Sequence, residues 1–295
     1  MQKISVALEW FLNPDHLPFL VAIDRGYFEK RGLEVQIQEP DEHYDGFEAL
    51  KKGGIVCAIN EPLHLIEQFD DQMVSLGTFF QTKGGVMLTT HGVEKLLSGQ
   101  KITLSTPVDN PKTDAIAREI LRRYVLKQGG IYAPEQTAFV KEDFYHIKHI
   151  QEGYDGAWLV FDNFEGVEAR QLGLSTSIID AKKASYPNFS ALDIYTTRHN
   201  FETKRSMLQA MIEALNEAIV WIQEGHECHD IYYRATRTQK SVLMDGIITA
   251  TRGCFQSPIR VDRASQVEIL NFFHSLGLST LSEDQFCGAF LDLFD

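Results

Sequence analysis

The chain has 295 residues, with 28 basic and 41 acidic side chains and a formal net charge of −13, and 44% of its residues are hydrophobic. Such a composition is typical of an ordinary globular protein long enough for one to three domains of about 100 to 200 residues. The acidic balance and the lack of a basic stripe argue against binding to nucleic acid or to an anionic membrane.

The chain contains no apolar run near the roughly 20 residues that a transmembrane helix needs. No signal peptide is recognisable, because residues 1–3 lead directly into an amphipathic strand. We therefore expect a cytoplasmic protein as the sequence is written, or a periplasmic one if a leader has been removed. Four cysteines are widely spaced and form no CxxC pair, which argues against a metal site and a disulfide framework. They are Cys57, Cys228, Cys254 and Cys287.

The first 37 residues predict one βαβ unit. Residues 4–8 and 33–37 alternate between apolar and polar side chains, and residues 17–23 form an apolar stretch between them. The loop after the first strand carries tryptophan, asparagine and histidine. In open α/β sheets the carboxyl ends of the strands are where ligands bind. This arrangement favours the capture of a small molecule.

The same rhythm of strand, loop and helix continues along the chain. We expect further strands at 55–59, 73–80, 86–90, 101–105, 136–140, 156–161, 175–179 and 191–197. Helices are expected at 45–52, 63–69, 115–127, 144–151, 207–223, 238–250, 264–276 and 283–293. The pattern predicts an α/β fold with two lobes joined by two crossings and a mostly helical C-terminal region. Lobe I would comprise residues 1–87 and 196–295, and lobe II residues 88–195.

Polar and aromatic side chains gather where the predicted strands end. Indole faces can stack on a flat heteroaromatic ring, while amides and carboxylates bond in its plane. A carboxylate suits the edge of an aminopyrimidine, which presents an N–H beside a ring nitrogen. The candidate ligand-binding residues are Trp10, Asn13, His16, Asn60, Glu61, His64, Ser105, Thr106, Trp158, Asn163 and Glu165.

Each candidate also has a structural interpretation. Tryptophans are common in cores, histidines can cap or face solvent, and glutamates at helix starts complement the helix dipole. The shared position of the candidates at strand ends favours a site. No GxSxG, Walker, GxGxxG or HExxH motif is present. His226, Cys228 and His229 have metal-like side chains, but a polar loop between helices is the favoured interpretation.

The pattern Trp10-x-x-Asn13-x-x-His16, followed by Gly26-Tyr27-Phe28-x-x-x-Gly32-Leu33-x-Val35, resembles a known family. It is the thiamine-pyrimidine branch of the type-2 periplasmic binding protein fold. This branch contains formylaminopyrimidine-binding proteins and the fungal-type thiamine-pyrimidine synthase, which builds the pyrimidine from pyridoxal phosphate and one of its own histidines. The similarity in element order extends over residues 3–225, and the motif match is confined to the N-terminal third. The resemblance implies a two-lobed, hinged fold.

The resemblance also implies roles for particular residues. Asn60 and His64 match a lysine and a histidine of the synthase, so the lysine that would hold pyridoxal phosphate is absent. The cysteine-rich motif of the synthase is absent too, since residues 187–191 contain no cysteine. Both departures argue against synthase chemistry. Glu165 matches a glutamate that grips the pyrimidine in the binding proteins, and Asn163 matches its neighbour.

We therefore expect a small-molecule binding protein whose two lobes close on a thiamine-pyrimidine-precursor-like heteroaromatic ligand, without a cofactor. Trp10 would stack on the ring, Glu165 and Asn163 would bond its polar edge, and Asn60 and His64 would line the opposite lobe. If the protein is exported, the membrane component of an ABC transporter would be its partner. The sequence leaves the oligomeric state open.

Two alternatives remain open at this point. One is a diverged thiamine-pyrimidine synthase or another biosynthetic enzyme on this fold, with His64 and either Glu61 or Glu165 in acid–base roles. The other is a cytoplasmic ligand sensor that uses the helical C-terminal region as a partner surface. Fold analogy alone does not separate these functions.

Overall fold

The computed structural model describes residues 1–40 and 46–295, and these residues divide into two compact units. Unit 1 comprises Met1–Gln81, Ala191–Leu270 and Ser279–Asp295. Unit 2 comprises Thr82–Ser190 and Asn271–Leu278. The chain therefore enters unit 2 at Thr82 and leaves it after Ser190. A short C-terminal segment also belongs to unit 2.

Unit 1 is built on a mixed sheet whose strand order, among the described residues, is β11-β4-β10-β3-β1-β2. β1 pairs in parallel with β2 and β3, while β10 runs antiparallel to β3 and β4. The strands are β1 (Gln2–Ala7), β2 (Leu33–Gln38), β3 (Cys57–Asn60), β4 (Met73–Gln81), β10 (Ala191–Thr197) and β11 (Phe255–Arg260). The helices of the unit are α1 (Leu17–Asp24), α2 (Gly46–Lys51), α3 (Pro62–Glu67), α9 (Arg198–Thr203), α10 (Arg205–Gln223), α11 (His229–Thr236), α12 (Val242–Thr251), α13 (Arg263–Ser275, whose last residues fall in unit 2) and α14 (Glu283–Cys287).

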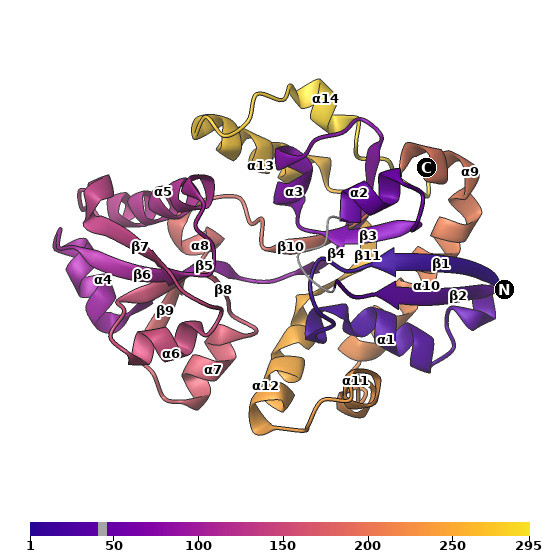
Figure 1. Cartoon of the computed structure of the whole chain (residues 1–295), viewed down its shortest axis with the longest axis horizontal. Helices are drawn as coiled ribbons and strands as arrows, with labels where there is room; N and C mark the ends of the chain where they lie inside the picture. Colours follow the sequence, from indigo (N-terminus) through magenta and orange to yellow (C-terminus); the bar gives the residue numbers. More distant parts are fainter. Residues whose placement is uncertain (41–45) are drawn as a thin grey trace. The chain divides into compact units, whose positions relative to one another are not determined.

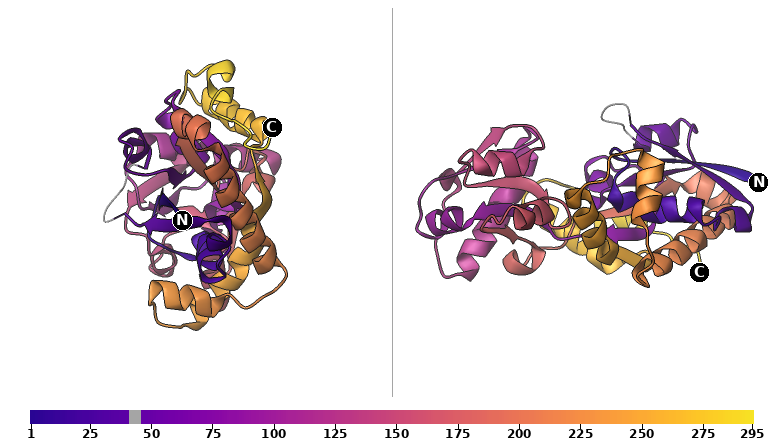
Figure 2. Two further views of the ribbon diagram at one scale, coloured as in Figure 1. Left: turned by 90° about the vertical axis from the view of Figure 1, so that its right-hand side faces the viewer. Right: turned by 90° about the horizontal axis from the view of Figure 1, so that it is seen from below.

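Successive side chains of the central strands of unit 1 point to opposite faces of the sheet, and helices cover each face. α1 and α10 lie side by side along one face of the sheet (Figures 1 and 2), and Ile59 and Ile194 are buried in the core that they share. The neighbouring residue Tyr195 instead contacts Phe47 of α2, with ring centroids 5.0 Å apart. Because successive strand residues point to opposite faces, this alternation places α2 on the face away from α1.

The glycine-containing turn between α1 and β2 explains the most recognisable part of the sequence. Gly26 and Gly32 have φ angles of 68° and 74°, a left-handed conformation that glycine adopts without the steric cost of a Cβ atom. Between them Tyr27 and Phe28 are buried. The two glycines turn the chain while the two aromatic rings anchor it, so that Leu33 can start β2 beside β1.

Unit 2 has its own sheet, with strand order β7-β6-β8-β5-β9 among the described residues. β6, β7 and β8 are parallel neighbours, and β5 runs antiparallel to β8 and β9. α6 and α7 share a core with inward side chains of β5 and β8, while α5 packs against β5 and β9 (Figure 1). The strands are β5 (Gly84–Thr89), β6 (Ile102–Thr106), β7 (Thr137–Lys141), β8 (Gly156–Phe161) and β9 (Thr176–Ile179). The helices are α4 (Thr90–Leu97), α5 (Pro111–Lys127), α6 (His146–Gln151), α7 (Glu165–Gln171) and α8 (Ala181–Ala184).

The α/β class and the order of the predicted elements are confirmed, with boundaries shifted by a few residues. The first residue of the helix expected at 45–52, Asp45, lies outside the described residues. The expectation of a mostly helical C-terminal region is confirmed by α9 to α14, and the strand β11 is an addition that the sequence did not predict. Its Phe255 and Ile259 are buried against unit 1 while the residues between them are partly or fully exposed, so tertiary pairing with β4 decides its conformation. The helix expected at 283–293 ends at Cys287.

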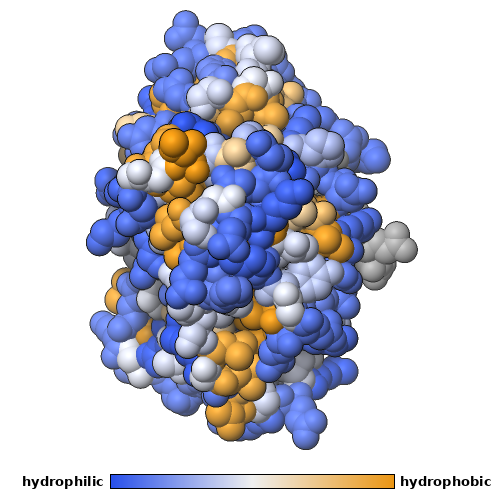
Figure 3. All heavy atoms as spheres, turned by 90° about the vertical axis from the view of Figure 1, so that its left-hand side faces the viewer, coloured by the Kyte–Doolittle hydropathy of each residue, from blue (hydrophilic) through white to orange (hydrophobic). Residues whose placement is uncertain are grey.

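Some large apolar side chains of the described residues are exposed. Figure 3 shows one side, on which apolar groups are separated by hydrophilic ones. Isolated exposed apolar residues such as Ile131 and Leu172 are normal on protein surfaces. Within the described ranges, no helix combines the length and apolar character needed to cross a membrane.

Candidate functional site

The loop after β1 is organised by a 3₁₀ helix, η1 (Pro14–His16), and by its cap Asn13. Asn13 Oδ1 accepts a hydrogen bond from the Asp15 N–H at 2.8 Å, and His16 Nδ1 accepts one from the Asn13 N–H at 3.3 Å. Reciprocal bonds of this kind form a capping box. Asn13 Nδ2 also donates to the Phe11 carbonyl at 3.0 Å. The polar atoms of Asn13 therefore shape the turn.

His16 is fully buried beneath this loop and pairs with Glu9, which the sequence analysis did not select. Its Nε2 lies 3.2 Å from each carboxylate oxygen of Glu9. Burial by itself lowers the pKa of His16, but the charge and hydrogen bond of Glu9 outweigh burial and raise the pKa above its usual value. Trp10, which follows Glu9 in the chain, is 40% exposed. Its ring meets that of Phe11 edge-on, with the ring centroids 5.3 Å apart.

The corner between β3 and α3 lies at the same edge of the sheet, because β1 and β3 are parallel neighbours. Asn60 ends β3, and its Oδ1 accepts a hydrogen bond from the Glu61 N–H at 3.0 Å. Burial raises the pKa of the Glu61 carboxyl, His64 opposes this rise, and Glu9 adds to it. His64 Nδ1 is buried and has no hydrogen-bond partner among the described residues. The edge thus holds two carboxyls and two imidazoles.

A buried carboxylate, Asp193, lies next to this corner on β10, directly opposite Asn60. It accepts hydrogen bonds from Thr78 Oγ1 at 2.6 Å and Ser75 Oγ at 3.0 Å. Gln266 Nε2 lies 3.4 Å away. Burial raises the pKa of Asp193, and these donors partly offset the rise. The donors hold a carboxyl group that would otherwise be costly to bury.

In unit 2 the end of β8 departs from regular strand geometry. Leu159 has a φ of 66°, a left-handed conformation that costs a branched side chain energy and often marks a functional site. Trp158 beside it is 2% exposed, and its Nε1 has no hydrogen-bond partner in the described part of the chain. An indole N–H that is buried in this way normally finds a partner.

The turn that follows β8 holds two further candidates. Glu165 begins α7, and its Oε2 accepts a hydrogen bond from the Phe161 N–H at 2.8 Å. Burial raises the pKa of Glu165 to about 7, although the backbone donors act against the rise. The carboxyl group can therefore donate or accept a proton near neutral pH. Asn163 Oδ1 accepts a hydrogen bond from Thr82 Oγ1 at 2.8 Å.

The carboxyl ends of β6 and β7 contribute another pair of buried polar residues. Ser105 Oγ and both ring nitrogens of His146 lack hydrogen-bond partners among residues 1–40 and 46–295. Burial, reinforced by the nearby His149, lowers the pKa of His146 to about 4, and Asp143 opposes this effect. The imidazole is therefore neutral near pH 7 and offers one donor and one acceptor. Thr106 Oγ1 is used locally, donating to the Val108 carbonyl at 3.2 Å.

Strand pairing brings the unit 2 groups to one edge of their sheet. Ser105 pairs with Ala157 and Thr106 with Lys141, in parallel register. The loops after β6, β7 and β8 therefore begin at the same edge. Within unit 1 the structure brings together Glu9, His16, Asn60, Glu61 and His64. Within unit 2, β6 with Ser105 and β8 with Trp158 are neighbouring strands, and Glu165 at the start of α7 and the loop leading to His146 follow β8 and β7. A neutral imidazole, an indole and a carboxyl that titrates near pH 7 suit a ligand with both donors and acceptors.

Sequence reasoning missed Glu9, His146 and Asp193. Glu9 and His146 carry the signal that identified the other candidates, since each follows a predicted strand. Asp193 carries no such signal, because it lies inside a strand and its donors come from distant parts of the chain.

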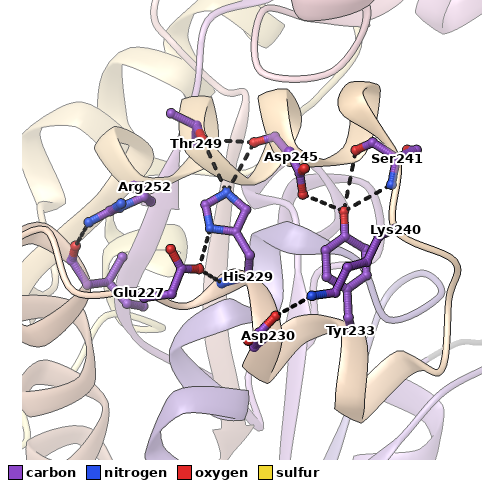
Figure 4. A network of polar contacts seen from close by, with 10 residues as sticks. Glu227, His229, Asp230, Tyr233, Lys240, Ser241, Asp245, Thr249 and Arg252 are labelled. Atoms are coloured by element: carbon purple, nitrogen blue, oxygen red, sulfur yellow. Dashed lines mark hydrogen bonds and ion pairs between the residues drawn. The ribbon is translucent and has the colours of Figure 1, made fainter.

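The segment with His229 forms a polar network between α11 and α12 (Figure 4). His229 Nδ1 lies 2.6 Å from Glu227 Oε1, and its Nε2 lies 3.3 Å from Thr249 Oγ1. Tyr233 donates to Asp245 Oδ1 at 2.7 Å. These contacts use both ring nitrogens of His229 to join two helices. The sequence placed His229 in a polar loop between helices, whereas in the structure it is the first residue of α11.

The other members of that segment are also engaged elsewhere. The His226 ring stacks on Trp221, with centroids 4.9 Å apart. Cys228 is buried, and burial raises the pKa of its thiol to about 11. Among the residues that the structure describes, no group of three or more potential ligands is arranged to hold a metal ion.

Comparison with known proteins identifies a family that this chain matches. The family model described as "NMT1/THI5 like" matches residues 13–226, which is more than half of the chain. A putative thiamine biosynthesis protein of Haemophilus influenzae is 54% identical over 39 residues, covering 13% of this chain and 12% of that protein. The 4-amino-5-hydroxymethyl-2-methylpyrimidine phosphate synthase of Uromyces fabae is 45% identical over 64 residues, covering 22% of this chain and 19% of that enzyme. The chain thus matches less than a fifth of the length of either relative.

Solved structures match almost the whole chain. A Candida albicans protein, described as defining a new family with the generic periplasmic binding protein fold, has a TM-score of 0.66 at 14% identity and covers 99% of this chain and 97% of its own. The ligand-binding component of an ABC-type import system from Staphylococcus aureus has a TM-score of 0.67 at 12% identity, covering 97% and 96%. At these identities the likeness shows the fold, which is that of the periplasmic binding proteins.

Proposed function

Because the chain belongs to the NMT1/THI5-like family, we propose that it is a binding protein for a small heteroaromatic molecule related to the thiamine pyrimidine. The named relatives are a putative thiamine biosynthesis protein and a pyrimidine phosphate synthase, and both concern this chemistry. The fold is one that a ligand-binding component of an import system also has. For an exported form, the proposal includes an ABC-transporter membrane component as partner.

The observation that carries the proposal is the group of buried, unpartnered polar atoms in unit 2. Ser105 Oγ, both nitrogens of His146 and Trp158 Nε1 lack partners within the described ranges. A buried donor or acceptor left unsatisfied costs about 1 to 3 kcal/mol. Ser105 near the end of β6 and His146 at the start of α6, which follows β7, lie near the carboxyl edge of this sheet, and a ligand that binds there would supply their missing donors and acceptors.

The chemistry of an aminopyrimidine fits these groups. Its exocyclic N–H and ring nitrogen match a carboxyl that can be present in either protonation state, as Glu165 is near pH 7. Trp10, with 40% of its surface exposed, is accessible for stacking on the ring from unit 1. We assign recognition of the polar edge to Glu165 and stacking to Trp10. Closure of the two lobes on the ligand is part of the proposal.

Binding is favoured over self-sacrificing synthesis by the side chain at the end of β3. The resemblance places a lysine where this chain has Asn60. An amide cannot form a Schiff base with pyridoxal phosphate, and the Asn60 amide oxygen is already bonded to the Glu61 N–H at 3.0 Å. We therefore route no chemical step through pyridoxal phosphate.

A second candidate function is that of another biosynthetic enzyme, and the Glu165 carboxyl favours it. A general acid or base works best when its pKa lies near the operating pH, and burial raises the pKa of Glu165 to about 7. Turnover of a pyrimidine substrate that is lost in Glu165→Gln, with binding retained, would select this candidate.

The test combines native mass spectrometry of the purified protein with calorimetric titration of 4-amino-5-hydroxymethyl-2-methylpyrimidine, its N-formylamino counterpart, thiamine and pyridoxal phosphate. We expect one pyrimidine to bind. Glu165→Gln and Trp10→Ala should each weaken it at least tenfold, which corresponds to about 1.4 kcal/mol. A decrease in the radius of gyration on ligand addition, measured by X-ray scattering, would report closure.

Matched variants make the result specific. Glu152→Gln changes an exposed glutamate of unit 2 and should leave affinity unchanged, and Trp10→Phe should restore most of the stacking lost in Trp10→Ala. If no pyrimidine binds, or if Glu152→Gln weakens binding as much as Glu165→Gln, the proposal is wrong.

A further inference from the structure

A pocket lies in unit 1, at the end of the sheet away from the carboxyl edge of β3. Its volume is about 480 Å³, within the usual range of small-molecule sites. It is lined by the segment that precedes β3 and by the start of α9, whereas the residues around Asn60 follow β3. The lining residues are Leu50, Lys51, Gly53, Ile55, Gln72, Thr197, His199, Asn200 and Lys204. The pocket is therefore distinct from the site proposed above.

The lining is basic in an otherwise acidic protein. It contains Lys51, His199 and Lys204 and no carboxylate, although the chain as a whole has a net charge of −13. Lys51 is already paired, with Glu48 at 3.0 Å and Asp70 at 3.1 Å. The excess positive charge of the pocket therefore rests mainly on Lys204.

Lys204 is partly buried and is held by a neutral partner. Its Nζ donates to Asn200 Oδ1 at 2.8 Å, and no described carboxylate forms an ion pair with it. Asn200 is only 6% exposed and is fixed by a second bond, from its Nδ2 to the Val56 carbonyl at 3.3 Å. A buried amide therefore positions the ammonium group in the pocket instead of leaving it free in solvent.

The nearby thiol does not balance this charge. Burial raises the pKa of Cys57 to about 12, although Lys204 acts in the opposite direction, so the thiol stays neutral near pH 7. An ammonium group that is partly removed from water and lacks a counter-charge is costly. An anionic ligand would offset that cost.

The remaining walls indicate what the anion carries. Leu50 and Ile55 are among the lining residues, so part of the wall is apolar, although each of the two residues is only 2–3% exposed. A volume of about 480 Å³ also exceeds what an inorganic anion alone would fill. Lysine ammonium groups commonly bind phosphate as point charges.

From this arrangement we propose that the pocket binds a small phosphate monoester, with the phosphate beside Lys204 and His199 and the carbon body against Leu50 and Ile55. This site adds a second ligand class to the protein and does not depend on the pyrimidine site. The carboxyl groups and imidazoles of the proposed pyrimidine site take no part in it.

The test is calorimetric titration of the full chain with phenyl phosphate, inorganic phosphate and benzoate at low and high salt. We expect phenyl phosphate to bind most tightly and its affinity to fall as salt is added. Lys204→Met should weaken phenyl phosphate at least tenfold, and Lys204→Arg should restore part of the affinity. Lys240→Met is the matched control, because Lys240 is exposed and paired with Asp230 at 2.6 Å.

Equal loss in Lys204→Met and Lys240→Met would overturn the assignment to this pocket. Inorganic phosphate or benzoate binding as tightly as phenyl phosphate would overturn the choice of a phosphate monoester. A circular dichroism spectrum and urea midpoint of Lys204→Met equal to those of the unmodified protein show that the variant is folded, so that loss of phenyl phosphate binding is assigned to the pocket whether or not a pyrimidine binds elsewhere.

Discussion

His16 Nε2 lies 3.2 Å from both carboxylate oxygens of Glu9, and the His16 ring has no exposed surface. Because Nδ1 of the same ring accepts the Asn13 N–H, Nε2 carries the proton that Glu9 accepts. One imidazole thus connects the start of the loop after β1 to the capping turn that ends it. The exposed Trp10 is the residue next to Glu9, so this pair fixes the base from which the indole projects.

The first prediction concerns this pair. Glu9 raises the pKa of His16, so their interaction stabilises the fold fully below the unfolded pKa of about 6.5 and is lost as pH rises through the folded pKa. Glu9→Gln should therefore lower the free energy of unfolding by about 1 to 2 kcal/mol at pH 5.5, and by less at pH 8.5. Urea unfolding followed by circular dichroism measures both values.

The control for this pair is Glu34→Gln, which removes an exposed ion pair with Lys3 at 3.8 Å. Exposed pairs contribute about 0 to 1 kcal/mol, so little change is expected. A loss in Glu9→Gln that is the same at both pH values would show that the charge on His16 is not involved.

Glu165 gives a stability profile whose slope has the same sign, because its pKa is also raised in the fold. Its pKa is raised to about 7 in the fold, so between pH 4.5 and 7 the folded state binds more protons than the unfolded state. The free energy of unfolding then falls as pH rises through this window, by up to about 1.4 kcal/mol per pH unit. Glu165→Gln keeps an acceptor for the Phe161 N–H and should remove this slope.

Chemical unfolding at pH 5, 6, 7 and 8 measures the effect of Glu165. We expect the variant to gain stability relative to the unmodified protein as pH rises to 7, and no further gain above it. Glu152→Gln, on the same unit, should follow the unmodified protein at every pH. Parallel profiles for Glu165→Gln and the unmodified protein would contradict the raised pKa.

His146 should destabilise the protein in acid. Burial lowers its pKa to about 4, so the unfolded state binds more protons between pH 4 and 6.5, and stability falls by about 3 kcal/mol as pH drops across this window. His149 and Asp143 are the titratable neighbours that act on it. His146→Leu removes both unpartnered nitrogens and should flatten the acid limb of the profile.

The same variant separates a structural role from a binding role. If His146 contacts the pyrimidine, His146→Leu weakens ligand affinity while raising stability at pH 5. His274→Leu changes an exposed histidine of unit 2 and should alter neither quantity. An acid limb unchanged in His146→Leu would assign the acid sensitivity to other groups.

The elements that sequence patterns predicted are those whose burial is periodic and local. Residues 17–23 and 156–161 are continuous apolar runs, and they form α1 and β8 close to the expected limits. β11 escaped prediction because only Phe255 and Ile259 face the core, and pairing with β4 rather than local preference makes it a strand. The α/β class was therefore predictable, and the strand in the C-terminal region was not.

The candidate site divides in the same way. The position of the candidate residues in the fold could be predicted, since Asn60 and Ser105 each lie near the carboxyl end of a parallel strand. What each side chain does there could not, because hydrogen bonding depends on neighbours distant in sequence. Asn13 caps its own turn, whereas Asp193 gathers donors from residues more than 100 positions away. The sequence pattern predicts which edge of the sheet carries polar residues. The hydrogen-bond partners of those residues follow only from the fold.

The last prediction tests why a C-terminal segment belongs to unit 2. Phe272 of α13 is 3% exposed, its ring centroid lies 6.0 Å from that of Phe189 and 6.1 Å from that of Tyr186, and the Arg123 guanidinium lies 4.9 Å from its ring centroid. Truncating a buried phenylalanine costs about 3 to 5 kcal/mol. Phe272→Ala should therefore destabilise unit 2 by several kcal/mol, whereas Phe294→Ala, at a ring that is 49% exposed, should change stability little.

Limited proteolysis with mass spectrometry shows which unit opens first. In Phe272→Ala we expect the earliest new cleavages inside residues 82–190, because α5 and the segment before β10 lose the ring against which Arg123, Tyr186 and Phe189 pack. Cleavage that begins instead within the N-terminal 81 residues would mean that the segment stabilises unit 1. An unchanged pattern would mean that the aromatic cluster contributes little to unit 2, and that α13 is held by its unit 1 residues alone.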